Sequence, residues 1–296
     1  MPFPEGRVAS VTMVRVCSKD GFASRVAALS FVCVASCGLA SIGCNGSVAD
    51  EPGADDPDES PLVRADVVGT QRSAVTYSEA VVIVPNDAFS ESCSGVLIAP
   101  RVVLTAAHCV VYVTTRSWTI TAPFAMGGEE RHVAHDGEPM DAAFRNVARE
   151  DYAARELRDV GLLYLDTPFK NAKAATLSPA TYALAKTAPP VFVSSVGRST
   201  EGVQAGLALT QPTMLDLPQT SRARIDYVTQ RITADGESGG PLFLEGTHKL
   251  VGVHAHAGAG GAGTKADAWA RLDGEVYTWM TQKVASHGGW NAPDSP

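Results

Sequence analysis

Charged residues are scarce in this sequence, and acidic residues outnumber basic ones. Charged side chains make up 19% of the 296 residues, and the formal net charge is −8. Nucleic-acid-binding proteins usually present a basic surface, so this balance argues against a nucleic-acid partner and provides no basic patch for a membrane. The hydrophobic content of 45% indicates a chain that folds around a core, and no internal repeat is visible.

Long apolar runs are also missing, except near the start of the chain. An apolar stretch from Val26 to Gly43 follows a basic region, which contains Arg7, Arg15, Lys19 and Arg25. This order is typical of an export signal, and we predict one over residues 1–44. The length of the stretch is also compatible with a transmembrane helix, but small residues and cysteines at its end favour a signal that is removed or lipidated.

Two cysteines at the end of this signal are candidate lipid-attachment sites. Cys37 follows Val34-Ala35-Ser36, which fits a lipoprotein signal, and Cys44 directly precedes a polar segment. The alternative is ordinary secretion, in which both cysteines are discarded. We therefore expect a secreted or cell-envelope protein, whose contact with a membrane would be limited to a lipid anchor at Cys37 or Cys44.

Cysteine is rare in the rest of the chain. Four of the six cysteines lie in the signal region, namely Cys17, Cys33, Cys37 and Cys44. Only Cys93 and Cys109 remain, and a single pair in an exported chain is typical of one disulfide. Such a bond would contribute about 3 kcal/mol through the entropy of the unfolded chain.

Three segments follow the signal. Residues 45–66 form an acidic linker or propeptide, residues 67–287 a folded region, and residues 288–296 a loose tail. Short β-branched runs, many bounded by Gly, Pro, Asn or Asp, predict an all-β sandwich or barrel for the folded region. Examples of these runs are Ala80–Val84, Gly95–Ile98, Val102–Leu104, Val160–Leu165, Val191–Val196, Leu242–Leu244 and Leu250–Val253.

Two segments depart from this β pattern. Val276, Met280 and Val284 recur four residues apart, which predicts a C-terminal helix from Glu275 to His287 with one apolar face. The region 141–158 is rich in alanine and charge. It is compatible with a helix, and we expect it to form a surface insertion.

Three motifs carry the residues that hydrolysis by a serine nucleophile requires, which are a hydroxyl, an imidazole and a carboxylate. In LTAAHC, small residues before His108 let the backbone turn tightly and expose the ring. In RDVGLL, Asp159 lies at the mouth of an apolar strand, where an unpaired acid would be costly. In GESGGP, the glycines around Ser238 allow a strained turn whose N–H groups point at one spot, as in an oxyanion hole.

In this order the three motifs resemble those of the trypsin-like (chymotrypsin-fold) serine proteases, over most of residues 67–285. The resemblance implies that His108 is the general base, that Asp159 orients it, and that Ser238 is the nucleophile. It also implies an oxyanion hole made by the N–H groups of Gly236 and Ser238. Cys93 and Cys109 match the disulfide that holds the histidine loop in this family.

The family's fold is a pair of six-stranded antiparallel β-barrels with the active site between them and a C-terminal α-helix. We therefore expect a monomeric serine endopeptidase that acts on protein or peptide substrates and needs no cofactor and no metal. The alternative is a catalytically idle binding or adhesion module on the same fold. An esterase is disfavoured, because no strand–GxSxG–helix elbow is visible.

The start of the folded region resembles the activation site of this family, whose members are made as zymogens. Val67-Val68-Gly69-Thr70 is similar to the IVGG-like start that cleavage exposes. In the family, the new amino group pairs with the Asp before the nucleophile, a position that Glu237 fills here. The extra methylene of Glu237 implies that the loop shifts slightly or that the pair is made differently. The alternative is that VVGT is simply the first strand.

Trypsin carries an acid six residues before its nucleophile, and this sequence has Ile232 there, which argues against cleavage after Lys or Arg. Thr233 and His254 are similar to the pair that binds an acidic P1 side chain in bacterial glutamyl endopeptidases. A hydroxyl and an imidazole can donate two charge-assisted hydrogen bonds to a carboxylate. The alternatives are an ordinary small or apolar pocket, or a metal bound by His254 and His256, which lie on the same side of a strand. An acidic preference would also allow cleavage of the Asp66–Val67 bond by the enzyme itself.

Overall fold

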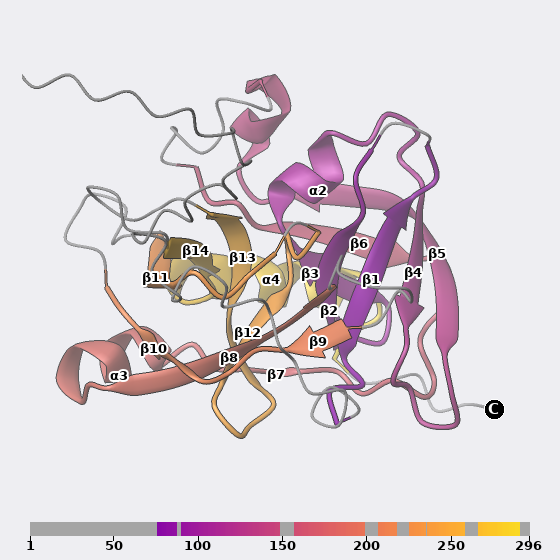
Figure 1. Cartoon of the computed structure of the whole chain (residues 1–296). Helices are drawn as coiled ribbons and strands as arrows, with labels where there is room; N and C mark the ends of the chain where they lie inside the picture. Colours follow the sequence, from indigo (N-terminus) through magenta and orange to yellow (C-terminus); the bar gives the residue numbers. More distant parts are fainter. Residues whose placement is uncertain are drawn as a thin grey trace, which may run out of the picture. The chain divides into compact units, whose positions relative to one another are not determined.

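Antiparallel strands are the main regular secondary structure of the described residues in the computed structural model (Figure 1). The structure describes residues 76–87, 90–148, 157–198, 207–217, 225–234, 236–257 and 266–290. The predicted signal, the acidic linker, Val67 and the last tail residues, 291–296, therefore lie outside the described residues.

The first half of the fold is a closed six-stranded barrel with the strand order β1-β2-β3-β6-β5-β4. All neighbouring pairs in it are antiparallel. Its strands are β1 (Ala80–Pro85), β2 (Cys93–Ala99), β3 (Val102–Thr105), β4 (Trp118–Ala122), β5 (Glu130–Pro139) and β6 (Gly161–Leu165).

The second half is an eight-stranded sheet with the path β10-β8-β12-β13-β14-β11, to which β7 and β9 are added at β13 and β8. Its strands are β7 (Thr176–Leu177), β8 (Val191–Arg198), β9 (Leu207–Leu209), β10 (Thr213–Leu215), β11 (Asp226–Gln230), β12 (Pro241–Leu244), β13 (Lys249–Ala257) and β14 (Ala266–Arg271).

This second sheet is not the closed six-stranded barrel that was expected. Its end strands β10 and β11 meet at one isolated bridge, where Asp216 and Val228 exchange two backbone hydrogen bonds of 2.7 and 3.0 Å. β10 has only three residues, so its free edge offers few backbone groups to β11, and among the described residues the contact is limited to this bridge. The other parts of the prediction, an all-β architecture with one closed barrel and a C-terminal helix, are confirmed.

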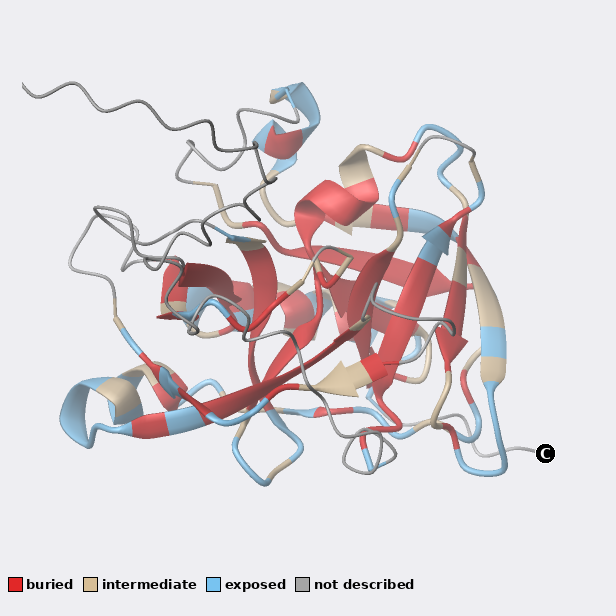
Figure 2. Cartoon of the chain, viewed as in Figure 1, coloured by how far each residue is buried: buried red, intermediate tan, exposed pale blue. Residues whose placement is uncertain are grey.

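Several central strands are buried on both faces, which explains why they read as unbroken apolar runs (Figure 2). Along β2, Val96 and Ile98 belong to a large core that also includes residues of the second sheet, whereas Leu97 faces the interior of the first barrel. Strand side chains alternate between faces, so one run supplies both cores.

Helix α4 (Gly274–Ser286) lies within one residue of its predicted bounds at both ends. Val276, Met280 and Val284 are buried in the same large core, as their spacing predicted. The other helical elements are α2 (Ala107–Val111), the 3-10 turn η1 (Ala142–Asn146) and α3 (Thr181–Thr187). The predicted insertion begins with η1, and part of it, residues 149–156, lies outside the described chain. None of the described helices is long and apolar enough to cross a membrane.

Candidate active site

His108 and Asp159 meet because the strands that carry them are neighbours in the first barrel. His108 lies in α2, directly after β3, and Asp159 lies two residues before β6. Strands β3 and β6 are paired so that Thr105 is opposite Gly161. The end of β3 therefore lies beside the start of β6, which brings the imidazole of His108 close to the carboxylate of Asp159.

The contact between the two side chains is short and buried. The Nδ1 atom of His108 lies 2.7 Å from Oδ2 of Asp159, and the backbone N–H of His108 donates to Oδ1 over 3.0 Å. Asp159 is only 3% exposed, so its carboxylate sits where an unpaired charge would be costly. Two bonds to one residue fix the ring orientation and turn Nε2 away from Asp159.

Gly161 makes this approach possible. A Cβ atom at this position would lie 2.9 Å from Cγ2 of Val110 and 3.1 Å from both the carbonyl oxygen of Ala106 and Cα of Ala107. Contacts this short force neighbouring atoms to move, and two of the three are backbone atoms. The Asp159 strand can therefore pack against the His108 helix only because a glycine starts it.

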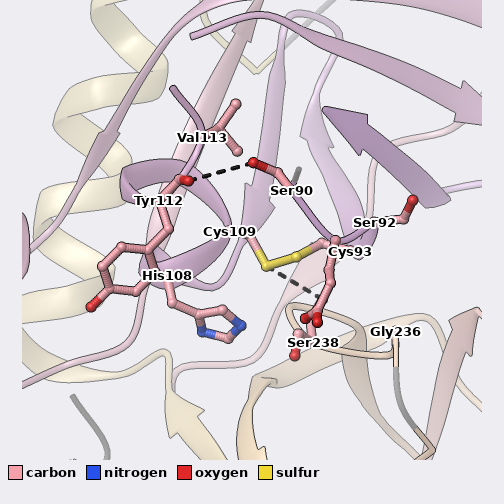
Figure 3. Close-up of a pocket in the computed structure, with 10 residues that line it drawn as sticks. Ser90, Ser92, Cys93, His108, Cys109, Tyr112, Val113, Gly236 and Ser238 are labelled. Carbon is pink, nitrogen blue, oxygen red and sulfur yellow. Dashed lines mark hydrogen bonds between the residues drawn. A yellow bond between two sulfur atoms is a disulfide. The ribbon is translucent and has the colours of Figure 1, made fainter. Parts of the chain in front are cut away.

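Ser238 lines the same hollow as His108, and Figure 3 shows both side chains beside the Cys93–Cys109 disulfide. The hollow has a volume of about 170 Å³. Its lining consists of Ser90, Glu91, Ser92, Cys93, His108, Cys109, Tyr112, Val113, Gly236 and Ser238. The structure thus places the predicted base and the predicted nucleophile at one surface depression.

The Ser238 loop is anchored to the first barrel through Ser94 of β2. The backbone N–H of Ser94 donates to the carbonyl oxygen of Ser238 over 2.8 Å, and its hydroxyl donates to that of Gly236 over 3.2 Å. Gly239, with φ +78°, fits against this anchor, since a Cβ there would lie 2.0 Å from Oγ1 of Thr105. These contacts span the two halves of the fold and set the position of the loop relative to His108.

The two amide groups assigned to the oxyanion hole belong to this anchored loop. Gly236 has φ +89°, in the left-handed region that glycine adopts without steric cost. Within the described part of the chain, the N–H groups of Gly236 and Ser238 donate no hydrogen bond. The loop therefore combines a left-handed glycine with two amide groups that take no part in the hydrogen bonds of these residues.

The predicted disulfide between Cys93 and Cys109 is confirmed. It joins the first residue of β2 to the middle of α2, one residue after His108. The indole N–H of Trp118 also donates to the carbonyl oxygen of Cys109 over 3.3 Å. The histidine helix is therefore fixed covalently and by a buried hydrogen bond.

Glu237 is fully buried beside the nucleophile. Both carboxylate oxygens are without a hydrogen-bond partner among the described residues, and Oε2 packs against the space where Gly197 has no Cβ. Burial, together with the nearby charge of Asp267, raises its pKa from 4.5 to about 8, although the nearby backbone of Ala234 acts in the opposite direction. A buried acid of this kind is a site that a cation would stabilise.

The predicted pocket residues lie next to the nucleophile loop. The backbone of His254 in β13 accepts from the N–H of Gly239 over 2.9 Å and donates to the carbonyl oxygen of Gly240 over 2.9 Å. The Nε2 atom of His254 lies 3.1 Å from the Thr233 hydroxyl, so these two side chains are in direct contact. Ile232 is only 6% exposed and belongs to the core of the second sheet.

Sequence reasoning missed a fourth residue of this cluster, Asp267 in β14. Its carboxylate accepts from the backbone N–H groups of Ile232 and Thr233 over 2.7 and 2.9 Å, and from the Thr233 hydroxyl over 2.9 Å. The sequence does contain a signal for Asp267, because it is the only acid within the short apolar run Ala266–Ala270. Asp159 was recognised in the same way, as an acid beside an apolar strand.

Comparison with known proteins identifies the family of this chain and two solved structures with a similar fold. The sequence profile of the Trypsin family matches residues 67–280, and no curated protein matches the sequence. Among solved structures, an HL collagenase is similar with a TM-score of 0.56 and 18% identity, over 72% of this chain and 95% of that chain. A VesB protease from Vibrio cholerae is similar with a TM-score of 0.52 and 19% identity, over 71% of this chain and 65% of that chain. At these identities the two structures indicate a shared fold.

Proposed function

Because the chain belongs to the trypsin family of serine proteases, we propose that it is an exported serine endopeptidase with His108, Asp159 and Ser238 as its catalytic triad. The observation that carries the proposal is the buried 2.7 Å contact between His108 and Asp159, at a hollow that Ser238 also lines. Peptide or protein substrates follow from the family.

The proposed reaction proceeds through an acyl-enzyme. Asp159 holds the Nδ1 proton of His108, which leaves the Nε2 lone pair to accept the proton of Ser238 as Oγ attacks the scissile carbonyl carbon. The N–H groups of Gly236 and Ser238 stabilise the resulting oxyanion. His108 then returns the proton to the leaving amine. A water molecule releases the acid product by the same two steps in the second half of the reaction.

A fluorophosphonate probe tests this function against the idle binding module. The processed protein should be labelled, and Ser238→Ala should abolish both labelling and peptide hydrolysis. Ser286→Ala is the matched control, because this exposed hydroxyl lies at the end of α4 and its contacts are local, with the carbonyl oxygen of Lys283 and Nδ1 of His287. A folded, processed protein that takes up no probe would contradict the proposal.

We also propose that cleavage before Val67 activates the enzyme and that the new ammonium group pairs with Glu237. Support comes from the buried carboxylate, which has no hydrogen-bond partner in the described part of the chain, and from the family match, which begins at Val67. The extra methylene of Glu237 is accommodated against Gly197, where a side chain would come within 2.9 Å of the carboxylate. N-terminal sequencing of the active enzyme should read Val-Val-Gly-Thr, and a different start in active enzyme would refute this switch.

The proposed protease has two alternative P1 preferences, one for acidic side chains and one for small or apolar side chains. The Thr233–His254 distance supports the pairing that an acidic preference requires. A peptide library cleaved by the wild type and by His254→Ala separates the two. Preference for Glu or Asp that His254→Ala abolishes supports the first, and preference for small or apolar residues supports the second.

Export through the N-terminal signal is part of the proposal, with lipidation at Cys37 or Cys44 as its anchored form. Mass spectrometry of the secreted or membrane-extracted protein distinguishes the two outcomes. A diacylglyceryl adduct on either cysteine supports the anchor, whereas a mature chain that begins beyond Cys44 indicates simple secretion.

A further inference from the structure

Asp267 is a fully buried acid that the catalytic mechanism does not use. It lies in β14, its side chain has no exposed surface, and it contacts three residues of the cluster beside the nucleophile loop. One carboxylate oxygen accepts two backbone N–H groups, those of Ile232 and Thr233. The other accepts the Thr233 hydroxyl over 2.9 Å and lies 3.6 Å from Nε2 of His254.

The direction of these hydrogen bonds follows from the chemistry of the groups. An ionised carboxylate can only accept, so the Thr233 hydroxyl must donate its single proton to Asp267. The Thr233 oxygen is then left as the acceptor for Nε2–H of His254, 3.1 Å away. The two protons that an acidic P1 side chain would need are therefore already used within the cluster, one by Asp267 and the other by the Thr233 oxygen.

Asp267 is ionised in this arrangement. Burial alone would raise the pKa of its carboxyl group, but the hydrogen bond and charge of His254 and the donors of Ile232 and Thr233 together hold that pKa below its ordinary value. Its negative charge also contributes to the raised pKa of Glu237. The base of the cluster thus carries a carboxylate of its own, close to a second buried acid.

We infer that Asp267 is a further specificity-determining residue, an internal carboxylate that occupies the Thr233–His254 pair and excludes acidic P1 side chains. This inference rests on the proposed protease function and decides between its two P1 preferences. A substrate carboxylate would find the Thr233 hydroxyl and Nε2–H of His254 already engaged and would face a like charge, which is unfavourable in a buried site. An uncharged P1 side chain meets neither obstacle.

Asp267 is an acid beside the predicted pocket, but it does not alter the expectation from Ile232 that the enzyme does not cleave after Lys or Arg. Three donors and a histidine ring surround the Asp267 carboxylate, so its oxygens are committed to the protein rather than offered to a substrate cation. Asp267 therefore acts through Thr233 and His254, and it is a positioning residue rather than a group that touches the substrate.

The test compares two peptides that differ only at P1, one with Glu and the other with Gln. The two side chains have nearly the same shape, so the ratio of their kcat/KM values reports charge selection. We expect the wild type to cleave the Gln peptide faster than the Glu peptide by about tenfold or more. General damage to the enzyme lowers both rates and leaves this ratio unchanged.

Asp267→Asn should shift the ratio toward the Glu peptide by about tenfold or more, because it removes the negative charge. The new amide can accept the backbone donors with its oxygen and donate to Thr233 with its nitrogen, which releases the hydroxyl proton for a substrate carboxylate. Asp166→Asn is the matched control, since this surface acid pairs with His135 and should leave the ratio at its wild-type value.

Fluorophosphonate labelling separates this inference from the proposed function. If the processed wild type is not labelled, the protease proposal fails. If it is labelled and prefers Glu over Gln, or if a labelled Asp267→Asn keeps the wild-type ratio, the inference is overturned and the protease proposal stands. If Asp267→Asn takes up no label, the wild-type ratio alone decides, and a preference for Gln supports the inference.

Discussion

The buried carboxylate of Glu237 predicts that one substitution should have opposite effects before and after activation. In the unprocessed chain this carboxylate has no hydrogen-bond partner among the described residues. Its pKa is raised to about 8, and burial is the main cause. In the processed chain the proposed ammonium of Val67 would compensate its charge. Glu237→Gln removes the charge while keeping nearly the same shape, so it should stabilise the first form and destabilise the second.

The magnitude follows from the pKa of Glu237 in the folded and unfolded states. The unfolded chain releases this proton near the ordinary pKa of 4.5, whereas the folded, unprocessed chain retains it to about 8. Stability therefore falls as the pH rises between these values and is unaffected by this group outside them. Over about 3.5 pH units, at about 1.4 kcal/mol per unit, the loss is about 5 kcal/mol.

The assay is unfolding by urea near pH 5 and near pH 9, with Ser238→Ala as the common background to prevent self-digestion. The unprocessed chain keeps its linker, and the processed chain is released from a fusion so that Val67 is the first residue. At the higher pH, Glu237→Gln should stabilise the unprocessed chain by about 5 kcal/mol. In the processed chain it should cost about 3–5 kcal/mol, because it breaks a buried pair. At the lower pH, the gain in the unprocessed chain should shrink to less than about 1 kcal/mol.

The change of sign is the decisive result. If Glu237→Gln changes the stability of both forms in the same direction, the Glu237 carboxylate does not gain a charged partner on activation, and the proposed switch is wrong. The unprocessed wild type should lose more stability between about pH 5 and pH 9 than unprocessed Glu237→Gln does. Equal losses would mean that the Glu237 carboxylate is either exposed or already paired in the unprocessed form.

Three further predictions concern the parts of the fold that hold the site. Gly239→Ala, whose Cβ would lie 2.0 Å from a hydroxyl oxygen, should destabilise by about 3 kcal/mol or more and abolish fluorophosphonate labelling, whereas Gly246→Ala, in open space, should cost about 1 kcal/mol and retain labelling. Equal losses in urea unfolding would show that the loop is not tightly fitted. Replacing Cys93 and Cys109 together by serine should lower the free energy of unfolding by about 3 kcal/mol for their separation of 16 residues, and an unchanged urea midpoint would count against this. Met280→Ala in the large core should cost about 2–5 kcal/mol in the same assay, and a loss below about 1 kcal/mol would mean that α4 is not part of that core.

The strands that could be predicted from the sequence are those buried on both faces. β2, β3 and β6 consist almost wholly of apolar, often β-branched residues, so their runs stand out against the glycines and polar residues around them. β5 was not predicted, because its sequence ERHVAHDGEP is polar and its residues alternate irregularly between buried and exposed. Its pairing with β4 and β6 through backbone hydrogen bonds makes it a strand, and such pairing leaves no mark on the local sequence.

The candidate triad residues were predictable for a different reason. His108, Asp159 and Ser238 each lie in a short run whose neighbours serve the same task, such as Gly161, which admits the His108 helix. Local sequence therefore records these sites. It does not record that His108 and Asp159, 51 residues apart, come within 2.7 Å, since that distance depends on the pairing of β3 with β6.

The sequence by itself determined the class of this protein, an all-β member of a serine protease family with a glycine-framed serine and one disulfide, because these features are local and each has a distinct chemical requirement. Only the tertiary structure decided what the residues around the pocket can do. Thr233 and His254 suggested an acid-binding pair, but Asp267, 34 residues beyond Thr233, accepts the hydroxyl proton of Thr233 and leaves the Thr233 oxygen as the acceptor for His254. Hydrogen bonds between strands are made by whichever residues the fold brings together, and a carboxylate that only accepts sets the direction of every bond in its cluster.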